Sequence, residues 1–414
     1  MTIPQMFRVK QTLEGPAIHN VPQAVREKVQ TLALHDRIKP GQTIAITAGS
    51  RGITRIDNIL WAVVQECRAF GLRPFIVPAM GSHGGATDEG QRHLLQHYGV
   101  TESTMGCEIK SSMEVVRIGE YKGVPVFCDR NAWDADHIAI VARVKPHTDF
   151  DHEIESGLFK MMSIGLGKRE GAEHYHRAGH HYGYADVFPA VGQKVLETGK
   201  VLFGLAVAEN GYGDTARVEA ILPEDFYEME KALLRQAKSW LGRLPFDDID
   251  LLIIDEMGKN VSGTGMDPNV TGRPCIQKHP TQPRVRQLLV CDLTPESDGN
   301  ALGLGMADLT TKRLVDKISR VTTNTNVITT GALDLAKVPM SFDSDRQAIE
   351  VALVMIGLTP PQDARIVRIK NTLHITEMDM SEPLRAEAEK NSRLTPLTTP
   401  APMPFDIEGN LTPF

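Results

Sequence analysis

The segment Thr43-Ile44-Ala45-Ile46-Thr47-Ala48-Gly49-Ser50-Arg51-Gly52 decides the fold, because a short apolar run leads directly into a glycine-rich loop. Apolar runs of similar length lie at residues 74–79 and 138–142, and each is also followed by a loop with charged or titratable side chains. Short strands that are apolar throughout are typical of parallel sheets covered by helices on both faces. The sequence therefore predicts an α/β fold whose sheets are mostly parallel.

A repeated loop marks the edge of this sheet where a ligand would bind. A helix is predicted over residues 56–70, where apolar residues recur at helical spacing, so the first two strands form a strand–helix–strand unit. Gly-Ser-Arg-Gly at residues 49–52 recurs as Gly-Ser-His-Gly at residues 81–84. Parallel strands end at the same edge of a sheet, which is where open α/β sheets bind ligands. Arg51 and His83 are therefore predicted to lie at one such edge.

The length of 414 residues suits two domains of ordinary size. A linker is predicted at residues 244–248, and a new strand at residues 250–255 runs into the glycine-rich loop 258–265, as at the start of a second α/β domain. We therefore expect an N-terminal α/β domain over residues 1–245, a C-terminal α/β domain over residues 246–414, and an active-site cleft between them. The remaining predicted elements are helices at residues 184–196, 224–241 and 345–357, strands at residues 285–291 and 364–370, and an extended or loosely ordered proline-rich tail.

The composition limits the partners and the compartment. A net charge of −7 argues against nucleic acid or an anionic membrane as the main partner, but it permits a small anionic substrate. The five cysteines are widely spread and form no Cys-x-x-Cys pair, which is typical of reduced thiols rather than of disulfides or a zinc site. No signal peptide is evident, and no apolar run reaches the roughly 18 residues of a membrane span. We expect a soluble cytoplasmic protein with a small-molecule ligand; a homo-oligomer is compatible with the sequence.

Histidines are concentrated in the middle of the chain. Six of them fall within 35 residues, against about one expected from an even spread of the 14 histidines. Histidine carries protons near neutral pH and is the commonest metal ligand, so the cluster points to a site. Two of the six, His174 and His176, share a face only if their segment is extended; in a helix at most one of them is expected to bind a metal. The six are His147, His152, His174, His176, His180 and His181.

Lys160 is the candidate for covalent chemistry. It lies in the segment Ser156-Gly157-Leu158-Phe159-Lys160-Met161-Met162, which is mostly apolar and contains a glycine. A lysine removed from water in such a setting loses part of its preference for the charged form and becomes a better nucleophile. The sequence leaves open whether Lys160 does this or only extends its charged end into water from a half-buried element.

These residues, taken in order, resemble a known family. His83 after a strand, then Pro146-His147, Ser156-Gly157-x-x-Lys160 and His176 form a pattern similar to that of the nickel-dependent lactate racemase family. The resemblance covers mainly residues 40–180. Members of this family carry a nickel-pincer nucleotide, a pyridinium derivative that is joined to a lysine and holds nickel.

The resemblance implies that the N-terminal domain carries the cofactor and the acid/base residues, and that the C-terminal domain closes the substrate cleft. It implies a racemase or epimerase of a 2-hydroxy acid, acting by reversible proton-coupled hydride transfer to the lysine-tethered nickel-pincer nucleotide. It also implies a role for each residue: Lys160 as the cofactor tether, His176 as the nickel ligand with His174 as the other candidate, His83 and His147 as the acid/base pair, and Arg51 and Lys259 as substrate-binding residues.

Two loops depart from the family pattern. The family's Asp-Gly-Thr-Arg is Ala48-Gly49-Ser50-Arg51 here, and the loop after His83 lacks the family's arginine and proline. These departures favour a divergent member that acts on a 2-hydroxy acid other than lactate.

Two other functions are compatible with the sequence. One is a metallohydrolase that uses His147, Asp149, His174 and His176 as its site. The other is a non-catalytic protein whose glycine loops bind a phosphorylated ligand through backbone amides. The sequence lacks both Gly-x-Gly-x-x-Gly and Gly-x-x-x-x-Gly-Lys-Ser/Thr, which weakens the common modes of nucleotide binding.

Overall fold

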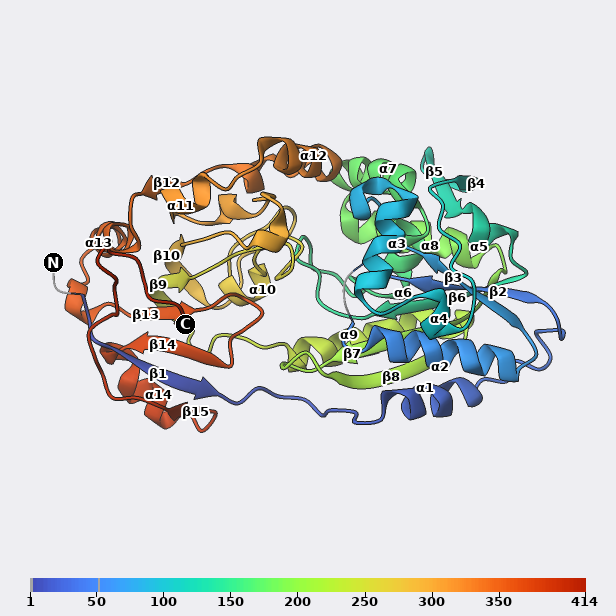
Figure 1. Ribbon diagram of the computed structural model, residues 1–414, viewed down its shortest axis with the longest axis horizontal. Coiled ribbons are helices and arrows are strands. Elements are labelled where there is room, and N and C mark those ends of the chain that lie inside the picture. The colour runs from blue at the N-terminus through green and yellow to red at the C-terminus, as the bar shows by residue number, and fades with distance from the viewer. Residues whose placement is uncertain (1–2, 51–52) are drawn as a thin grey trace. The chain divides into compact units, whose positions relative to one another are not determined.

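The computed structural model describes residues 3–50 and 53–414, which form two compact units. The N-terminal unit comprises residues 14–147 and 151–241, and the C-terminal unit comprises residues 3–13, 148–150 and 242–414. Both units have α/β character with mostly parallel sheets (Figure 1). Within the described residues, no helix is both long and apolar enough to cross a membrane.

The N-terminal unit is built on a five-stranded sheet with the order β3-β2-β6-β7-β8. All neighbours are parallel except the last pair, β7 and β8, which is antiparallel. The three strands predicted in the first third of the chain are confirmed, because their short apolar runs are buried between helices. The strands are β2 (Thr43–Ala48), β3 (Arg73–Pro78), β6 (His137–Arg143), β7 (Val201–Glu209) and β8 (Thr215–Ile221).

Helices cover this sheet, and a separate hairpin packs beside two of them. The helix predicted at residues 56–70 is confirmed as α2, which buries Ile59, Leu60 and Val63 completely. The helices are α1 (Val21–Gln30), α2 (Ile56–Ala69), α3 (Asp88–His97), α4 (Glu102–Met105), α5 (Arg130–Asp134), α6 (Leu158–Lys160), α7 (Lys168–Tyr182), α8 (Tyr184–Leu196) and α9 (Phe226–Trp240), with short turns η1 (Gly84–Ala86) and η3 (Pro223–Asp225) and a π-helix η2 (Met161–Gly165). The hairpin consists of β4 (Val115–Tyr121) and β5 (Val124–Asp129).

The C-terminal unit contains an eight-stranded sheet with the order β12-β11-β10-β9-β13-β14-β1-β15. The first five strands are parallel, and the rest pair antiparallel. The strands are β1 (Met6–Gln11), β9 (Asp248–Ile254), β10 (Arg284–Val290), β11 (Leu309–Thr311), β12 (Met340–Phe342), β13 (Ile366–Ile369), β14 (Glu377–Ser381) and β15 (Leu394–Pro396). The helices are α10 (Pro268–Thr271), α11 (Lys312–Val315), α12 (Arg320–Thr330), α13 (Asp345–Met355) and α14 (Arg385–Lys390), with short turns η4 (Pro295–Ser297), η5 (Leu304–Met306), η6 (Leu333–Ala336), η7 (Pro361–Asp363) and η8 (Glu382–Leu384).

The two units differ from the predicted domains, residues 1–245 and 246–414, chiefly at the N-terminus. Strand β1 belongs to the C-terminal unit, where it lies between β14 and β15. The reason is burial: Phe7 and Val9 are 2% and 0% exposed in the core of that unit. A pairing between strands so far apart in the chain leaves no local signal in the sequence.

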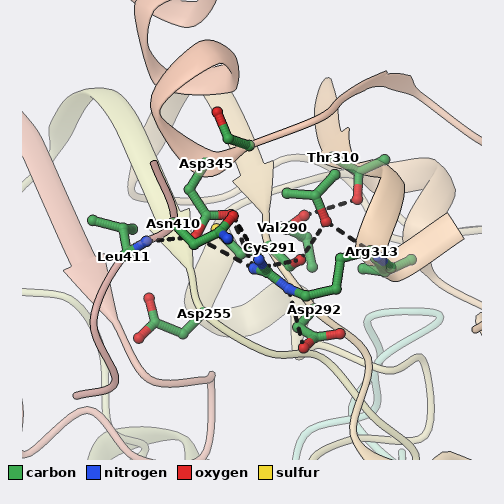
Figure 2. A network of polar contacts seen from close by, with 12 residues as sticks. Asp255, Val290, Cys291, Asp292, Thr310, Arg313, Asp345, Asn410 and Leu411 are labelled. Atoms are coloured by element: carbon green, nitrogen blue, oxygen red, sulfur yellow. Dashed lines mark hydrogen bonds and ion pairs between the residues drawn. The ribbon is translucent and has the colours of Figure 1, made fainter. Parts of the chain in front are cut away.

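The proline-rich tail is held in place by charged side chains near the end of β10, of which Asp345 is buried. Figure 2 shows Arg313, which donates to Asp345 (3.0 Å) and to Asn410 (2.9 Å). The Asp345 carboxylate also accepts the backbone N–H of Leu411 at 2.8 Å. The tail is therefore bonded to side chains of α11 and α13 rather than loose. It is not extended throughout, because it turns back at residues 406–409 and pairs Phe405 with Leu411 in an antiparallel bridge.

Replacing Asp345 by Ala should lower the free energy of unfolding by about 2–3 kcal/mol, because hydrogen bonds to a charged group are lost at a site that is 1% exposed. The tail should also become accessible to protease, which mass spectrometry of a timed digest would show. Asp334→Ala is the control, since that side chain is 87% exposed in its pair with Lys337. Equal digestion of the two variants would contradict the role of Asp345.

Candidate functional site

His83 lies in the loop after β3 and is held by the loop after β2. The register pairs Ala48 with Pro78, so both loops leave the same edge of the sheet. The Nδ1 atom of His83 is in hydrogen-bond contact with the Ser50 hydroxyl. The Ser50 carbonyl in turn accepts the phenol O–H of Tyr98 at 2.7 Å. The repeated loops of the sequence therefore meet through their side chains.

Lys160 and His147 touch each other. His147 follows β6 and is 5% exposed, whereas Lys160 ends the short helix α6 and is half-buried. The Nζ atom of Lys160 is in direct contact with Nε2 of His147. Two basic nitrogens in contact cannot both carry a proton without strong repulsion, so the pair is suited to share one.

His176 packs against the same aromatic side chain as His147. The rings of His147 and His176 both pack against Phe188, with centroid distances of 6.4 Å and 5.8 Å. The Nδ1 atom of His176 donates to the carbonyl of Ala172 at 2.6 Å, because a carbonyl can only accept. The remaining nitrogen, Nε2, is therefore the one that carries a lone pair in the neutral ring.

His174 points elsewhere because its segment is helical. Both histidines lie on α7, where a spacing of two residues places side chains on different faces. The His174 ring packs against Phe127 at 5.4 Å, and its Nδ1 donates to the carbonyl of Glu170 at 2.8 Å. The structure thus brings His176, and not His174, to the ring that His147 contacts.

A π-helix connects the lysine to both loops. The segment Met161–Gly165 directly follows Lys160, and its last carbonyl accepts the N–H of Gly81 at 3.4 Å. A Cβ atom added at Gly49 would lie 3.1 Å from Cε of Met161, and one added at Gly81 would lie 3.0 Å from Ile164. The glycines of both loops therefore allow close packing on this segment. π-helices are rare in proteins, and those that do occur are often found at functional sites.

Sequence reasoning missed a buried polar network that supports the His83 loop. Lys168, Gln91 and Asp129 are all 0% exposed. The Lys168 ammonium binds Asp129 at 3.0 Å, the side-chain oxygen of Gln91 at 3.2 Å, and the carbonyl of Pro78. Gln91 donates to the carbonyls of Gly81 (3.0 Å) and His83 (3.2 Å). Both ends of the loop are thereby tied to the first residue of α7.

Burial makes this network costly unless it is complete. Desolvation raises the pKa of Asp129 and lowers the pKa of Lys168, although each attracts the other's charge. The only signal in the sequence is Lys168 beside the glycines of Gly165-Leu166-Gly167, which does not identify its partners.

The remaining predicted residues are Arg51, Lys259 and Asp149. Arg51 falls outside the described residues. Lys259, in the C-terminal unit, donates to the carbonyl of Gly263 and to the side-chain oxygen of Asn326 (2.8 Å). Asp149 also belongs to the C-terminal unit, where its carbonyl accepts the N–H of Gln277 at 2.8 Å. Across residues 3–50 and 53–414, no three or more His, Cys, Asp or Glu side chains are grouped so as to hold a metal ion.

Replacing Lys168 by Met should lower the free energy of unfolding by about 3–5 kcal/mol, because Asp129 would stay buried without its partner. Adding Asp129→Asn to this variant should restore part of the loss. Urea unfolding of the wild type, both single variants and the double variant measures the coupling. Additive losses in the double variant would show that the pair does not act as a unit.

Comparison with known proteins relates the N-terminal part of the chain to one family. Residues 6–184 match the family described as "Lactate racemase N-terminal domain". No curated protein matches the sequence. Among solved structures, the chain is similar to the lactate racemase apoprotein from Thermoanaerobacterium thermosaccharolyticum, with a TM-score of 0.54 and 12% identity over 88% of this chain and 94% of that one. Residues 6–184 therefore belong to the family of lactate racemase N-terminal domains.

Proposed function

We propose that this chain is an isomerase that racemises or epimerises a 2-hydroxy acid. The observation that carries the proposal is the contact between the Lys160 amine and Nε2 of His147, with His176 packed on the same Phe188 ring. The proposal also draws on the family membership of residues 6–184. The altered loops around Ser50 and His83 favour a substrate other than lactate.

The side chains present suit a lysine-tethered nickel-pincer nucleotide. Lys160 supplies a half-buried primary amine for covalent attachment. His176 supplies an imidazole whose Nδ1–H is bonded to a carbonyl, which is how proteins orient a histidine that ligates a metal through Nε2. When bound, such a group supplies a pyridinium ring that accepts hydride from carbon.

The chain's own residues would then move the proton of the substrate hydroxyl. Loss of hydride from Cα is easy only if this proton leaves at the same time, so a base must contact the hydroxyl. Two enantiomers require a base on each side, and His83 and His147 are the pair we assign. The guanidinium of Arg51 would bind the carboxylate through two parallel hydrogen bonds while the keto carbon presents its other face.

His83→Ala and His147→Ala should each reduce isomerisation by about a hundredfold or more, the range of general acid–base catalysis, while leaving the fold intact. Thermal melts and a chiral assay of 2-hydroxy acids measure the two effects. His181→Ala is the matched control, because this exposed histidine lies at the end of the same cluster. Near-normal turnover in both variants would disprove the assignment.

Lys160 should carry a covalent adduct when the protein is co-expressed with enzymes that make the pincer nucleotide. Intact-mass spectrometry should show added mass in the wild type and none in Lys160→Arg. His176→Ala should keep the adduct but lose nickel, as measured by elemental analysis. A bare polypeptide under these conditions, from a host shown to load another family member, would remove the cofactor from the proposal.

A further inference from the structure

Helix α9 reaches both members of the Lys160–His147 contact through buried carboxyl groups. This helix plays no part in the pattern that identifies the family, and it lies 66 residues or more beyond Lys160. Glu230 on α9 binds the segment that carries Lys160, and Lys238 on α9 binds a second carboxylate, Glu155, which holds His147.

Glu230 holds the first turn of α6. It is 0% exposed, and its Oε2 atom accepts the backbone N–H groups of Leu158 (2.7 Å) and Phe159 (3.2 Å). A Cβ atom added at Gly157 would lie 2.5 Å from Cδ of Glu230, so a glycine is needed for this approach. Lys160 is the last residue of the same turn, and its backbone position is therefore set from α9.

Glu155 holds the backbone of His147. It is 1% exposed, its Oε2 atom accepts the N–H of His147 at 2.6 Å, and its Oε1 atom accepts the N–H of His152 at 3.1 Å. The ammonium of Lys238 contacts the same Oε1 atom. A buried carboxylate with one cation and two N–H donors is well compensated, which fixes the loop between His147 and Glu155.

We propose that Glu230, Glu155 and Lys238 are positioning residues that hold the Lys160 amine against Nε2 of His147. The catalytic value of this contact rests on the proposed function, but the contact itself does not. Helix α9 provides one rigid element for both residues, and rigid support of this kind is what keeps reacting groups within a fraction of an ångström of their working geometry.

The environment of Glu230 suggests which variant should preserve its role. Burial raises the pKa of Glu230 to about 8, so its carboxyl is largely protonated near neutral pH while Oε2 still accepts both N–H groups. Glutamine offers the same neutral acceptor oxygen. Glu230→Gln should therefore preserve the contact, whereas Glu230→Ala should lose it.

The test is the pH profile of acetylation at Lys160, read peptide by peptide by mass spectrometry after brief treatment with acetic anhydride. An amine in contact with an imidazole titrates as a coupled pair, so the wild-type profile should show two steps. His147→Gln should show a single step and serves as the reference for a lost contact. We expect Glu230→Ala, Glu155→Gln and Lys238→Met to lose the second step as well, and Glu230→Gln to regain it.

The matched control is a second ion pair from the same helix to the same loop. Lys231 binds Glu153 at 2.7 Å, and the Glu153 side chain is 51% exposed, unlike the buried Glu155 and Glu230. Lys231→Met and Glu153→Gln should keep both steps.

A two-step profile that persists in Glu155→Gln and Lys238→Met would overturn the proposal, even if Glu230→Ala fails to fold. A single step in the wild type would also overturn it, whereas absence of racemisation with these profiles intact would count only against the proposed function.

Discussion

The contact between the Lys160 amine and Nε2 of His147 is the interaction on which the candidate site depends. Two basic groups stay in contact only if the surrounding protein holds them there, because in water each would be solvated separately. The N-terminal unit achieves this by fixing both backbones: His147 through Glu155, and the turn before Lys160 through Glu230. The chemistry proposed for the chain thus relies on side chains that never need to touch a substrate.

Buried polar groups support the His83 loop and the contact between Lys160 and His147. Lys168, Asp129 and Gln91 support the loop of His83, and Glu155 and Glu230 support the lysine–imidazole contact. Each such group costs free energy unless it is fully bonded, so a chain that keeps several of them in one unit gains a defined geometry in return. We infer that positional precision, more than stability, explains why these residues are polar.

In the C-terminal unit, a network of charged side chains holds the end of the chain rather than a candidate site. There the charged network of Arg313, Asp345 and Asp292 lies at the end of β10, and it binds the chain's own tail. Strand β1 adds the other terminus to the same sheet. Both ends of the described chain are thus held in the C-terminal unit, by interactions between residues that lie far apart in the sequence.

The sequence by itself determined the α/β class, most strands and helices, and the family of residues 6–184, because apolar runs, helical periodicity and motif order are local properties. It also selected His83, His147, Lys160 and His176 by residue type and order. Only the tertiary structure decided that β1 joins the distant β14, that a helical α7 separates His174 from His176, and that α9 supports the site. These outcomes depend on pairing and burial between segments far apart in the chain, for which a single sequence carries no local signal.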